Sequence, residues 1–299
     1  MTIKEFLEEI IRVFKKAGVE CAETEARQLA CHVLSCSPAF LVSHSGDEVD
    51  DKVLLASAAL INERCKGRPI QYVLGSANFY GIDLAVDERV LIPRPETELL
   101  AEEAITFLKD RPFPKTMDLC TGSGAIAAAV ASNVPNVKVI ATELSPKAFM
   151  LARVNLRPYE NVKVLRGDLF EALKSEETDK TNSASGTNDT GGPGRGSFDA
   201  ILTNPPYIPA EVISTLSREV KDYEPRMALD GGADGLDIIR RIIKEAPEHL
   251  KPGGMLLMEI GHDQGTAVID LAAQTGAYRE ARIIKDLEGH DRMLRAIKL

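Results

Sequence analysis

The chain has 299 residues, of which 44% are hydrophobic and 27% are charged, which suffices for one large soluble domain with a smaller appended one. Its 36 basic and 45 acidic residues give a net charge of −9, which disfavours broad binding to nucleic-acid phosphates, although a local basic patch stays open. The five cysteines form no CxxC pair and have no metal-type spacing, which argues against a disulfide framework or a zinc site and predicts a reduced, cytoplasmic protein.

The N-terminal segment predicts a small helical bundle. Apolar residues recur at helical spacing in residues 2–17, 22–35 and 51–65, and Gly18 ends the first helix. Charged residues interrupt the apolar ones in MTIKEFLEEIIRVFKKAG, so this segment is predicted to be neither a signal peptide nor a membrane span. We therefore expect a helical domain over residues 1–68.

A β-hairpin linker is predicted for residues 69–95. Alternating apolar residues in FYGIDLAV indicate two short paired strands. The prolines of the motif IPRPETE then lead into a helix that begins near Glu96. Helix capping alone explains Glu96 and Thr97, so we interpret this motif as structural, with a place beside a cofactor as the alternative.

A doubly wound, Rossmann-like α/β domain is predicted for residues 96–299. From residue 115 onward, helical patterns alternate with short apolar strands, namely KTMDLC, VKVIATE, VKVLRG, FDAILTN, GGMLLMEIG, YREARIIKD and DRMLRAIKL. This alternation predicts a seven-stranded, mainly parallel and doubly wound sheet with helices on both faces. The last two strands are joined only by the short EGHD, so they should pair as an antiparallel hairpin at one end of the sheet.

A polar stretch, residues 174–197, interrupts this order. Its only apolar side chain is Ala184, and it contains five glycines in its second half. Such a stretch cannot offset its ordering entropy by burial, so we predict a disordered surface insertion between the third and fourth strands.

The ends of the first three strands predict a nucleoside-bearing cofactor. In MDLCTGSGAIAAA, Gly122 and Gly124 let the backbone approach a ligand at a helix N-terminus, although a tight turn also requires glycine. Glu143 ends the next strand about 20 residues later, where an acid can bind ribose hydroxyls unless it is merely solvated. Asp168 follows the third strand and either accepts from an adenine amino group or caps a helix.

The fourth strand ends in NPPY, which distinguishes between the enzymes that use such cofactors. The two prolines terminate the strand and stiffen the backbone. Methylation of an amide or exocyclic amine requires a rigidly held NH₂ group, whose two N–H bonds the Asn204 side-chain oxygen and the Pro205 carbonyl could accept. The Tyr207 ring could pack against the planar acceptor. This favours methyl transfer over a nicotinamide dehydrogenase, for which the sequence offers no hydride-transfer arrangement.

Nearly the whole chain carries motifs of one family. These are RPIQYVLG (68–75), VLIPRPETELL (90–100), DLCTGSGAIA (118–127), TNPPYIP (203–209), YEPRMALDGGADGLDIIRRI (223–242), LKPGGMLLMEIG (250–261) and DLEGHDRM (286–293). Together they resemble the HemK/PrmC family, protein-(glutamine-N5) methyltransferases that act on class I peptide-chain release factors. NPPY alone also occurs in adenine-N6 DNA and guanine-N2 ribosomal RNA methyltransferases, so its combination with PRPETE and EPRMALDGG carries the resemblance.

The resemblance implies a class I methyltransferase domain that uses S-adenosyl-L-methionine (AdoMet), preceded by a helical domain that docks the protein substrate. By analogy, the glycine turn neighbours the methionine moiety, Glu143 holds the ribose, and Asp168-Leu169 lies by the adenine. The implied cofactor-binding residues are Asp118, Cys120, Thr121, Gly122, Ser123, Gly124, Glu143, Asp168, Leu169 and Asn204. The implied catalytic residues, which would grip the glutamine of the release factor's Gly-Gly-Gln loop, are Asn204, Pro205, Pro206 and Tyr207.

Two positions depart from the family pattern. Cys120 stands where the family commonly has glycine, so a positive φ at this position would be costly. Some relatives place an aromatic residue near Leu169, and its absence here removes a stacking partner for adenine. Neither departure removes a group that the chemistry needs.

The resulting prediction is an AdoMet-dependent enzyme of translation termination that methylates the loop glutamine of class I release factors. We expect a cytoplasmic monomer that binds no metal, no nucleic acid directly and no membrane. The alternative is a methyltransferase for adenine N6 or guanine N2 of nucleic acids, which NPPY supports and the net charge of −9 opposes. A non-catalytic interaction module built on the N-terminal helices is opposed by the intact NPPY.

Overall fold

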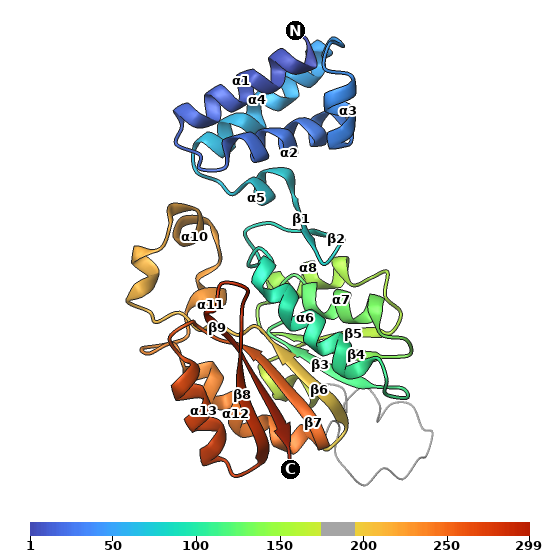
Figure 1. Ribbon diagram of the computed structural model, residues 1–299, viewed down its shortest axis with the longest axis vertical. Coiled ribbons are helices and arrows are strands. Elements are labelled where there is room, and N and C mark those ends of the chain that lie inside the picture. Colours follow the sequence, from blue (N-terminus) through green and yellow to red (C-terminus); the bar gives the residue numbers. More distant parts are fainter. Residues whose placement is uncertain (175–194) are drawn as a thin grey trace. The chain divides into compact units, whose positions relative to one another are not determined.

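The computed structural model describes residues 1–174 and 195–299 (Figure 1). The predicted disordered insertion at 174–197 therefore falls almost wholly outside the described residues. In the part of the chain that is described, no helix is long and apolar enough to cross a membrane. The chain divides into two compact units.

The first unit is a helical bundle formed by residues 1–76 together with 217–223. Its helices are α1 (Ile3–Lys16), α2 (Ala22–Leu34), α3 (Pro38–Ser43), α4 (Asp51–Cys65), α5 (Ile70–Leu74) and α10 (Arg218–Tyr223). Thr2 begins α1 with a capping box, because its hydroxyl accepts the N–H of Glu5 and the Glu5 carboxylate accepts the N–H of Thr2. The three long helices confirm the predicted bundle, whereas α3 and α5 are too short to give a periodic signal.

Helix α10 joins this unit from far along the chain. The Arg64 side chain on α4 is only 3% exposed and bonds to Glu25 of α2 and to Glu219 of α10. The Tyr223 hydroxyl at the end of α10 donates to the Lys66 carbonyl over 3.3 Å. The sequence contains no local signal for this pairing, so the predicted domain limits at residues 68 and 95 do not include it.

The predicted hairpin consists of β1 (Ser76–Phe79) and β2 (Ile82–Ala85), which form a two-stranded sheet. Tyr80 and Gly81 connect the strands and have φ values of +52° and +77°. A two-residue loop with both residues left-handed is the turn that fits the twist of a hairpin.

The second unit is built on a seven-stranded sheet in the order β5-β4-β3-β6-β7-β9-β8. Its strands are β3 (Lys115–Leu119), β4 (Lys138–Glu143), β5 (Val162–Arg166), β6 (Phe198–Thr203), β7 (Leu250–Glu259), β8 (Tyr278–Lys285) and β9 (Asp291–Lys298). The strands from β3 to β7 pair in parallel, and β9 pairs antiparallel to both β7 and β8. The predicted doubly wound sheet with its terminal hairpin is thereby confirmed.

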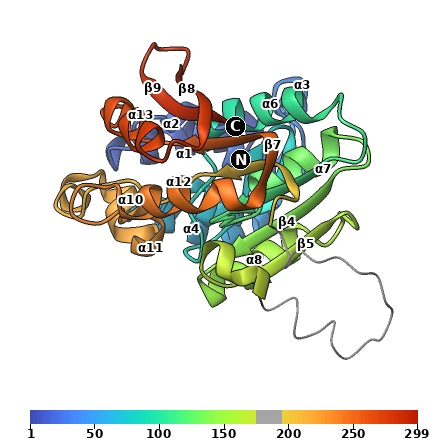
Figure 2. The same ribbon diagram turned by 90° about the horizontal axis from the view of Figure 1, so that it is seen from below.

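Helices cover both faces of this sheet, with α6 and α7 on one side and α12 and α13 on the other (Figures 1 and 2). The covering helices are α6 (Pro95–Leu108), α7 (Ala125–Asn133), α8 (Pro146–Asn155), η1 (Leu169–Lys174), α12 (Asp237–His249) and α13 (Gly265–Gln274). All six residues of β6 are buried, as expected for a central strand covered on both faces. Two short helices, η2 (Val212–Thr215) and α11 (Arg226–Leu229), lie in the connection between β6 and α12. The carboxyl edge of the sheet is thus the place for a ligand.

Candidate active site

The carboxyl ends of neighbouring parallel strands meet around one cavity of about 530 Å³. The register explains the meeting, because Leu119 of β3 pairs with Thr142 of β4 on one side and with Thr203 of β6 on the other. The predicted site residues that line the cavity are Cys120, Thr121, Gly122, Ser123, Glu143, Asp168, Leu169, Asn204 and Pro206. The predicted site residues outside this lining are Asp118, Gly124, Pro205 and Tyr207.

The turn after β3 has a left-handed backbone at Cys120, Gly122 and Gly124, with φ values of +56°, +56° and +86°. At Gly124 a Cβ atom would stand 2.8 Å from Cγ of Leu156, so only glycine fits there. Cys120 adopts the strained conformation although it carries a side chain. Burial, together with the nearby Glu143 carboxylate, raises the pKa of the Cys120 thiol, which therefore stays protonated.

Glu143 holds the glycine turn in place from the end of β4. Its two carboxylate oxygens accept the backbone N–H of Gly122 over 2.9 Å and that of Ser145 over 2.8 Å. Burial raises the pKa of Glu143, while these two N–H groups lower it. Each oxygen keeps a further lone pair, so the side chain can fix the turn and still accept from a ligand hydroxyl.

Asp118 lies at 0% exposure beneath the turn. Its Oδ2 atom accepts the Thr121 hydroxyl over 2.5 Å. Among the described residues, neither its Oδ1 atom nor the buried Oγ1 atom of Thr142 has a hydrogen-bond partner. Burial raises the pKa of Asp118 to about 7, against the lowering effect of the Thr121 hydroxyl. A buried carboxylate oxygen without a full partner is costly, and the backbone N–H of Ala127 offsets part of this cost for Asp118.

Asp168 follows β5, lines the cavity and is paired with Arg241, a residue far from it in the sequence. Its Oδ2 atom accepts from Nη2 of Arg241, on α12, over 2.8 Å. The N–H of Glu171 bonds to the Asp168 carbonyl rather than to its side chain, so the alternative of a side-chain helix cap is not adopted. Leu169, buried next to it, has a φ of +46°.

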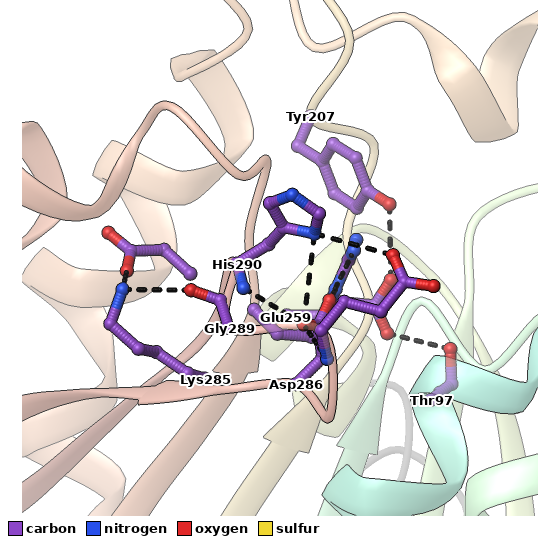
Figure 3. Close-up of polar contacts among 10 residues, drawn as sticks. Thr97, Tyr207, Glu259, Lys285, Asp286, Gly289 and His290 are labelled. Carbon is purple, nitrogen blue, oxygen red and sulfur yellow. Dashed lines mark hydrogen bonds and ion pairs between the residues drawn. The ribbon is translucent and has the colours of Figure 1, made fainter.

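The polar side chains of NPPY are linked to a buried carboxylate, Glu259, whose contacts with Tyr207 and Thr97 are seen in Figure 3. Asn204 donates from Nδ2 to the Thr97 hydroxyl over 3.2 Å, and this hydroxyl donates to Oε2 of Glu259 over 2.6 Å. The Tyr207 hydroxyl donates to the other oxygen, Oε1, over 3.1 Å. Thr97, at the start of α6, therefore belongs to the site as well as to a helix start, and Glu259 is a residue that the sequence analysis missed.

Two acceptor oxygens of NPPY, one on a side chain and one on the backbone, receive no hydrogen bond in the part of the chain that is described. Among residues 1–174 and 195–299, neither the Asn204 Oδ1 atom nor the Pro205 carbonyl accepts a hydrogen bond. The next residues are tied down, because Gln264 donates from Nε2 to the Tyr207 carbonyl over 2.9 Å. The motif thus holds two free acceptor oxygens, of which Asn204 Oδ1 belongs to a residue of the cavity lining and the Pro205 carbonyl to its buried neighbour.

Further residues of the cavity come from the motifs PRPETE and EPRM. Arg94 and the segment 225–228 are part of its lining. Arg94 donates from Nη2 over 2.6 Å to Glu224, whose side chain is 1% exposed and also accepts the N–H of Ile92. This ion pair between a half-buried arginine and a buried glutamate holds the two motifs together beside the cavity. The only sign of this ion pair in the sequence was that one motif contains Arg94 and the other contains Glu224.

Comparison with known proteins places the chain in a family. Family models match for the PrmC N-terminal domain, over residues 5–75, and for the methyltransferase small domain, over residues 97–184. A release factor glutamine methyltransferase from Rhodopirellula baltica is 35% identical over 300 residues, which span 98% of this chain and 95% of that protein. The protein of the same name from Geobacter sulfurreducens is 36% identical over 295 residues, with coverages of 98% and 95%.

A solved structure is also similar, that of the release-factor-specific protein-(glutamine-N5) methyltransferase from Alicyclobacillus acidocaldarius. It shares 31% sequence identity and a TM-score of 0.42, and the match covers 69% of this chain and 94% of that one. The curated relatives match at above 30% identity along nearly their whole length. On these grounds the chain belongs to the release factor glutamine methyltransferase family.

Proposed function

We propose that this protein transfers a methyl group from AdoMet to the side-chain amide nitrogen of the glutamine in the Gly-Gly-Gln loop of class I peptide-chain release factors. The observation that carries the proposal is the free Oδ1 acceptor of Asn204, a residue of the cavity lining in a chain from this family, with the Pro205 carbonyl as a second free acceptor beside that lining. A primary amide has two N–H bonds in one plane, and two acceptors on a rigid backbone match them.

The residues around the cavity fit AdoMet. The glycine turn with Thr121 and Ser123 would border the methionine moiety, with the Asp118 carboxylate buried beneath it, and Glu143 suits the ribose hydroxyls. Asp168 and Leu169, which line the cavity beyond Glu143, would border the adenine. The volume of about 530 Å³ lies in the range of small-molecule sites.

When bound, AdoMet supplies an electrophilic methyl group on a sulfonium sulfur. Asn204 and Pro205 would then hold the acceptor NH₂ group, which fixes the orientation of a nitrogen whose lone pair is delocalised. Their oxygens would also stabilise the positive charge that develops on the NH₂ group during transfer. Pro206 lines the cavity, and the Tyr207 hydroxyl bond to Glu259 anchors the far end of the motif. We further propose that the enzyme works as a monomer in the cytoplasm, the compartment in which release factors act.

The two acceptors of Asn204 and Pro205 would also fit an exocyclic amine of adenine or guanine, so nucleic-acid methylation is the alternative. The net charge of −9 disfavours it, because nucleic-acid binding is dominated by phosphate contacts. A direct comparison decides between the two acceptors. Labelled methyl from AdoMet should enter a purified class I release factor, should fail to enter that factor when its loop glutamine is replaced, and should not enter DNA or ribosomal RNA.

Asn204→Ala removes one of the two acceptors and tests the geometry. We expect methyl transfer to fall by about 100-fold or more, as for loss of a positioned hydrogen bond to a developing charge. AdoMet binding, measured by calorimetry, should weaken far less than the rate. Incorporation into nucleic acid but not into the release factor would contradict the proposal.

A further inference from the structure

Glu259 is a buried carboxylate that has no role in the reaction as proposed above. It ends β7, beside β6, and the register that pairs Met258 with Thr203 brings it next to NPPY. Its exposure is 2%. Thr97 and Tyr207 donate to its two oxygens, so one group receives side chains from both the PRPETE and the NPPY motifs (Figure 3).

The hydrogen-bond geometry favours the ionised form of Glu259 against the effect of its burial, because each of its two oxygens receives a hydroxyl. Burial, with a smaller effect of the Glu96 carboxylate, raises the pKa of Glu259 above its ordinary value, while the two hydroxyls and the charge of Arg292 on β9 oppose this rise. Arg292 is itself held by Asp286, whose Oδ2 accepts from its Nε and Nη2 atoms over 3.2 and 2.9 Å. The terminal motif DLEGHDRM therefore supplies the positive charge that faces this carboxylate.

The hydrogen bonds are donated from Asn204 to Thr97 and from Thr97 to Glu259, so the acceptor Glu259 fixes the direction of both. A carboxylate only accepts, so the Thr97 hydroxyl donates its single proton to Glu259. The Thr97 oxygen is then the acceptor for Nδ2 of Asn204, at 3.2 Å. With Nδ2 engaged, the oxygen Oδ1 lies at the free end of the carboxamide.

We propose that Glu259 is a positioning residue that, through Thr97, keeps the oxygen of the Asn204 carboxamide turned toward the methyl-accepting nitrogen. An asparagine side chain presents either its oxygen or its NH₂ group when its terminal bond rotates by half a turn, and only the oxygen can receive a substrate N–H. The same carboxylate also fixes the Tyr207 hydroxyl. This inference rests on the proposed function, because it requires an NH₂ acceptor.

Glu259→Gln tests the direction of this relay without changing the shape of the side chain. Glutamine has one accepting oxygen and one donating NH₂ group, so it cannot accept from both hydroxyls. Where the NH₂ group faces Thr97, the threonine proton turns toward Asn204 and draws Oδ1 away from the substrate. We expect kcat for release-factor methylation to fall about 10-fold to 100-fold. The KM for AdoMet and the thermal unfolding midpoint should stay close to those of the wild type.

A matched pair at residue 97 separates the hydroxyl from the packing. Thr97→Ser keeps the hydroxyl and should retain kcat within about threefold, whereas Thr97→Val keeps the shape and should lose about as much as Glu259→Gln. In an Asn204→Ala background, Thr97→Val and Glu259→Gln should have little further effect, because both act through Asn204.

The outcomes distinguish this inference from the proposed function. If the wild-type enzyme leaves release factors unmethylated, the proposed function fails and this inference fails with it. If the wild type is active and Glu259→Gln or Thr97→Val leaves kcat unchanged, only the relay is wrong. Losses that add fully to that of Asn204→Ala would also overturn the relay, since they would show an effect that does not pass through Asn204.

Discussion

Gly235 lies so close to the Tyr207 carbonyl that a Cβ atom on residue 235 would stand 2.2 Å from its oxygen. The residue also has a φ of +76°, which a side chain disfavours. Gly231 is similarly close, since its Cβ would be 2.8 Å from Cα of Tyr207. Two glycines of the DGGADGLD segment thus serve to let this loop support the backbone of NPPY from behind.

Gly235→Ala should therefore displace Tyr207 and lower methyl transfer by about 100-fold, because misplacement of a reacting group by about 1 Å has effects of that size. Gly81→Ala is the matched control, with a φ of +77° and no atom within 4 Å of its Cβ position. It carries the same backbone strain, about 1–2 kcal/mol, without the clash. Steady-state rates and unfolding midpoints of both variants check this, and equal loss of activity in the two would show that strain alone matters.

The Cys120 thiol should resist alkylation although it lines the cavity. Its pKa is raised by burial, and the thiolate is the reactive form, so iodoacetamide at neutral pH should leave it unmodified in the folded protein. The exposed Cys21 should react under the same conditions. Peptide mapping by mass spectrometry, with the unfolded chain as reference, measures both residues. Labelling of Cys120 at a rate similar to that of Cys21 would contradict the claim that the Cys120 thiol stays protonated.

The sheet and the strand-end residues were predictable from local patterns. Short apolar runs separated by helical periodicity specify parallel strands, and the carboxyl ends of parallel strands meet at one edge. For this reason Glu143, Asp168 and Asn204 could be assigned to one cavity before any contact was known. The glycine turn was equally visible, because a small-residue loop with two glycines follows the first apolar strand, and at residue 124 the left-handed backbone together with the contact to Leu156 excludes any side chain.

What escaped prediction depends on long-range contacts. Glu259 ends the apolar run GGMLLMEIG and looks like a solvated strand end, while its donors Thr97 and Tyr207 lie 162 and 52 positions away. Thr97 was fully explained as part of a helix start, which concealed its second contact. The pairing of Asp168 with Arg241 spans 73 positions and was likewise invisible in the local pattern.

The stability of the unliganded protein should depend on pH through Asp118. Because its pKa of about 7 in the folded protein lies above the ordinary value of 3.8, the folded state binds a proton that the unfolded state has lost. This contribution to stability is fully present below about pH 4 and is lost as the pH rises through about 7. The unliganded protein should accordingly lose stability over this range, as thermal unfolding would record.

In the proposed binding mode, the ammonium group of AdoMet at the glycine turn would favour the ionised form of the Asp118 carboxylate beneath it through its charge, so binding near pH 7 should release a proton and tighten from pH 6 to pH 8. Calorimetry in buffers of different ionisation enthalpy measures that proton. Glu143, whose pKa burial also raises, would face uncharged ribose hydroxyls, so Asp118→Asn should remove most of the proton release. An unchanged release in Asp118→Asn would assign the proton to another group.

Arg64 should stabilise the first unit far more than a surface arginine does. Its guanidinium is buried between Glu25 and Glu219, and Arg64→Ala leaves Glu25, only 13% exposed at its side chain, without its cation. Loss of one partner from a buried ion pair typically costs about 3–5 kcal/mol. Arg12→Ala is the control, because Arg12 pairs with Glu9 at a side-chain exposure of 66% and should change the free energy of unfolding by less than about 1 kcal/mol.

Chemical denaturation of both variants measures these differences, and limited proteolysis shows whether α10 is released in Arg64→Ala. Since Arg64 bonds to Glu219 and the Lys66 carbonyl accepts from Tyr223, α10 keeps only one of these two contacts in the variant. We expect cleavage within residues 217–223 to become faster in Arg64→Ala and to be unaffected in Arg12→Ala. Equal cleavage in the two variants would mean that the ion pair between Arg64 and Glu219 does not hold this helix, since Arg12 makes no contact with α10 in the pairs described and serves only as the control.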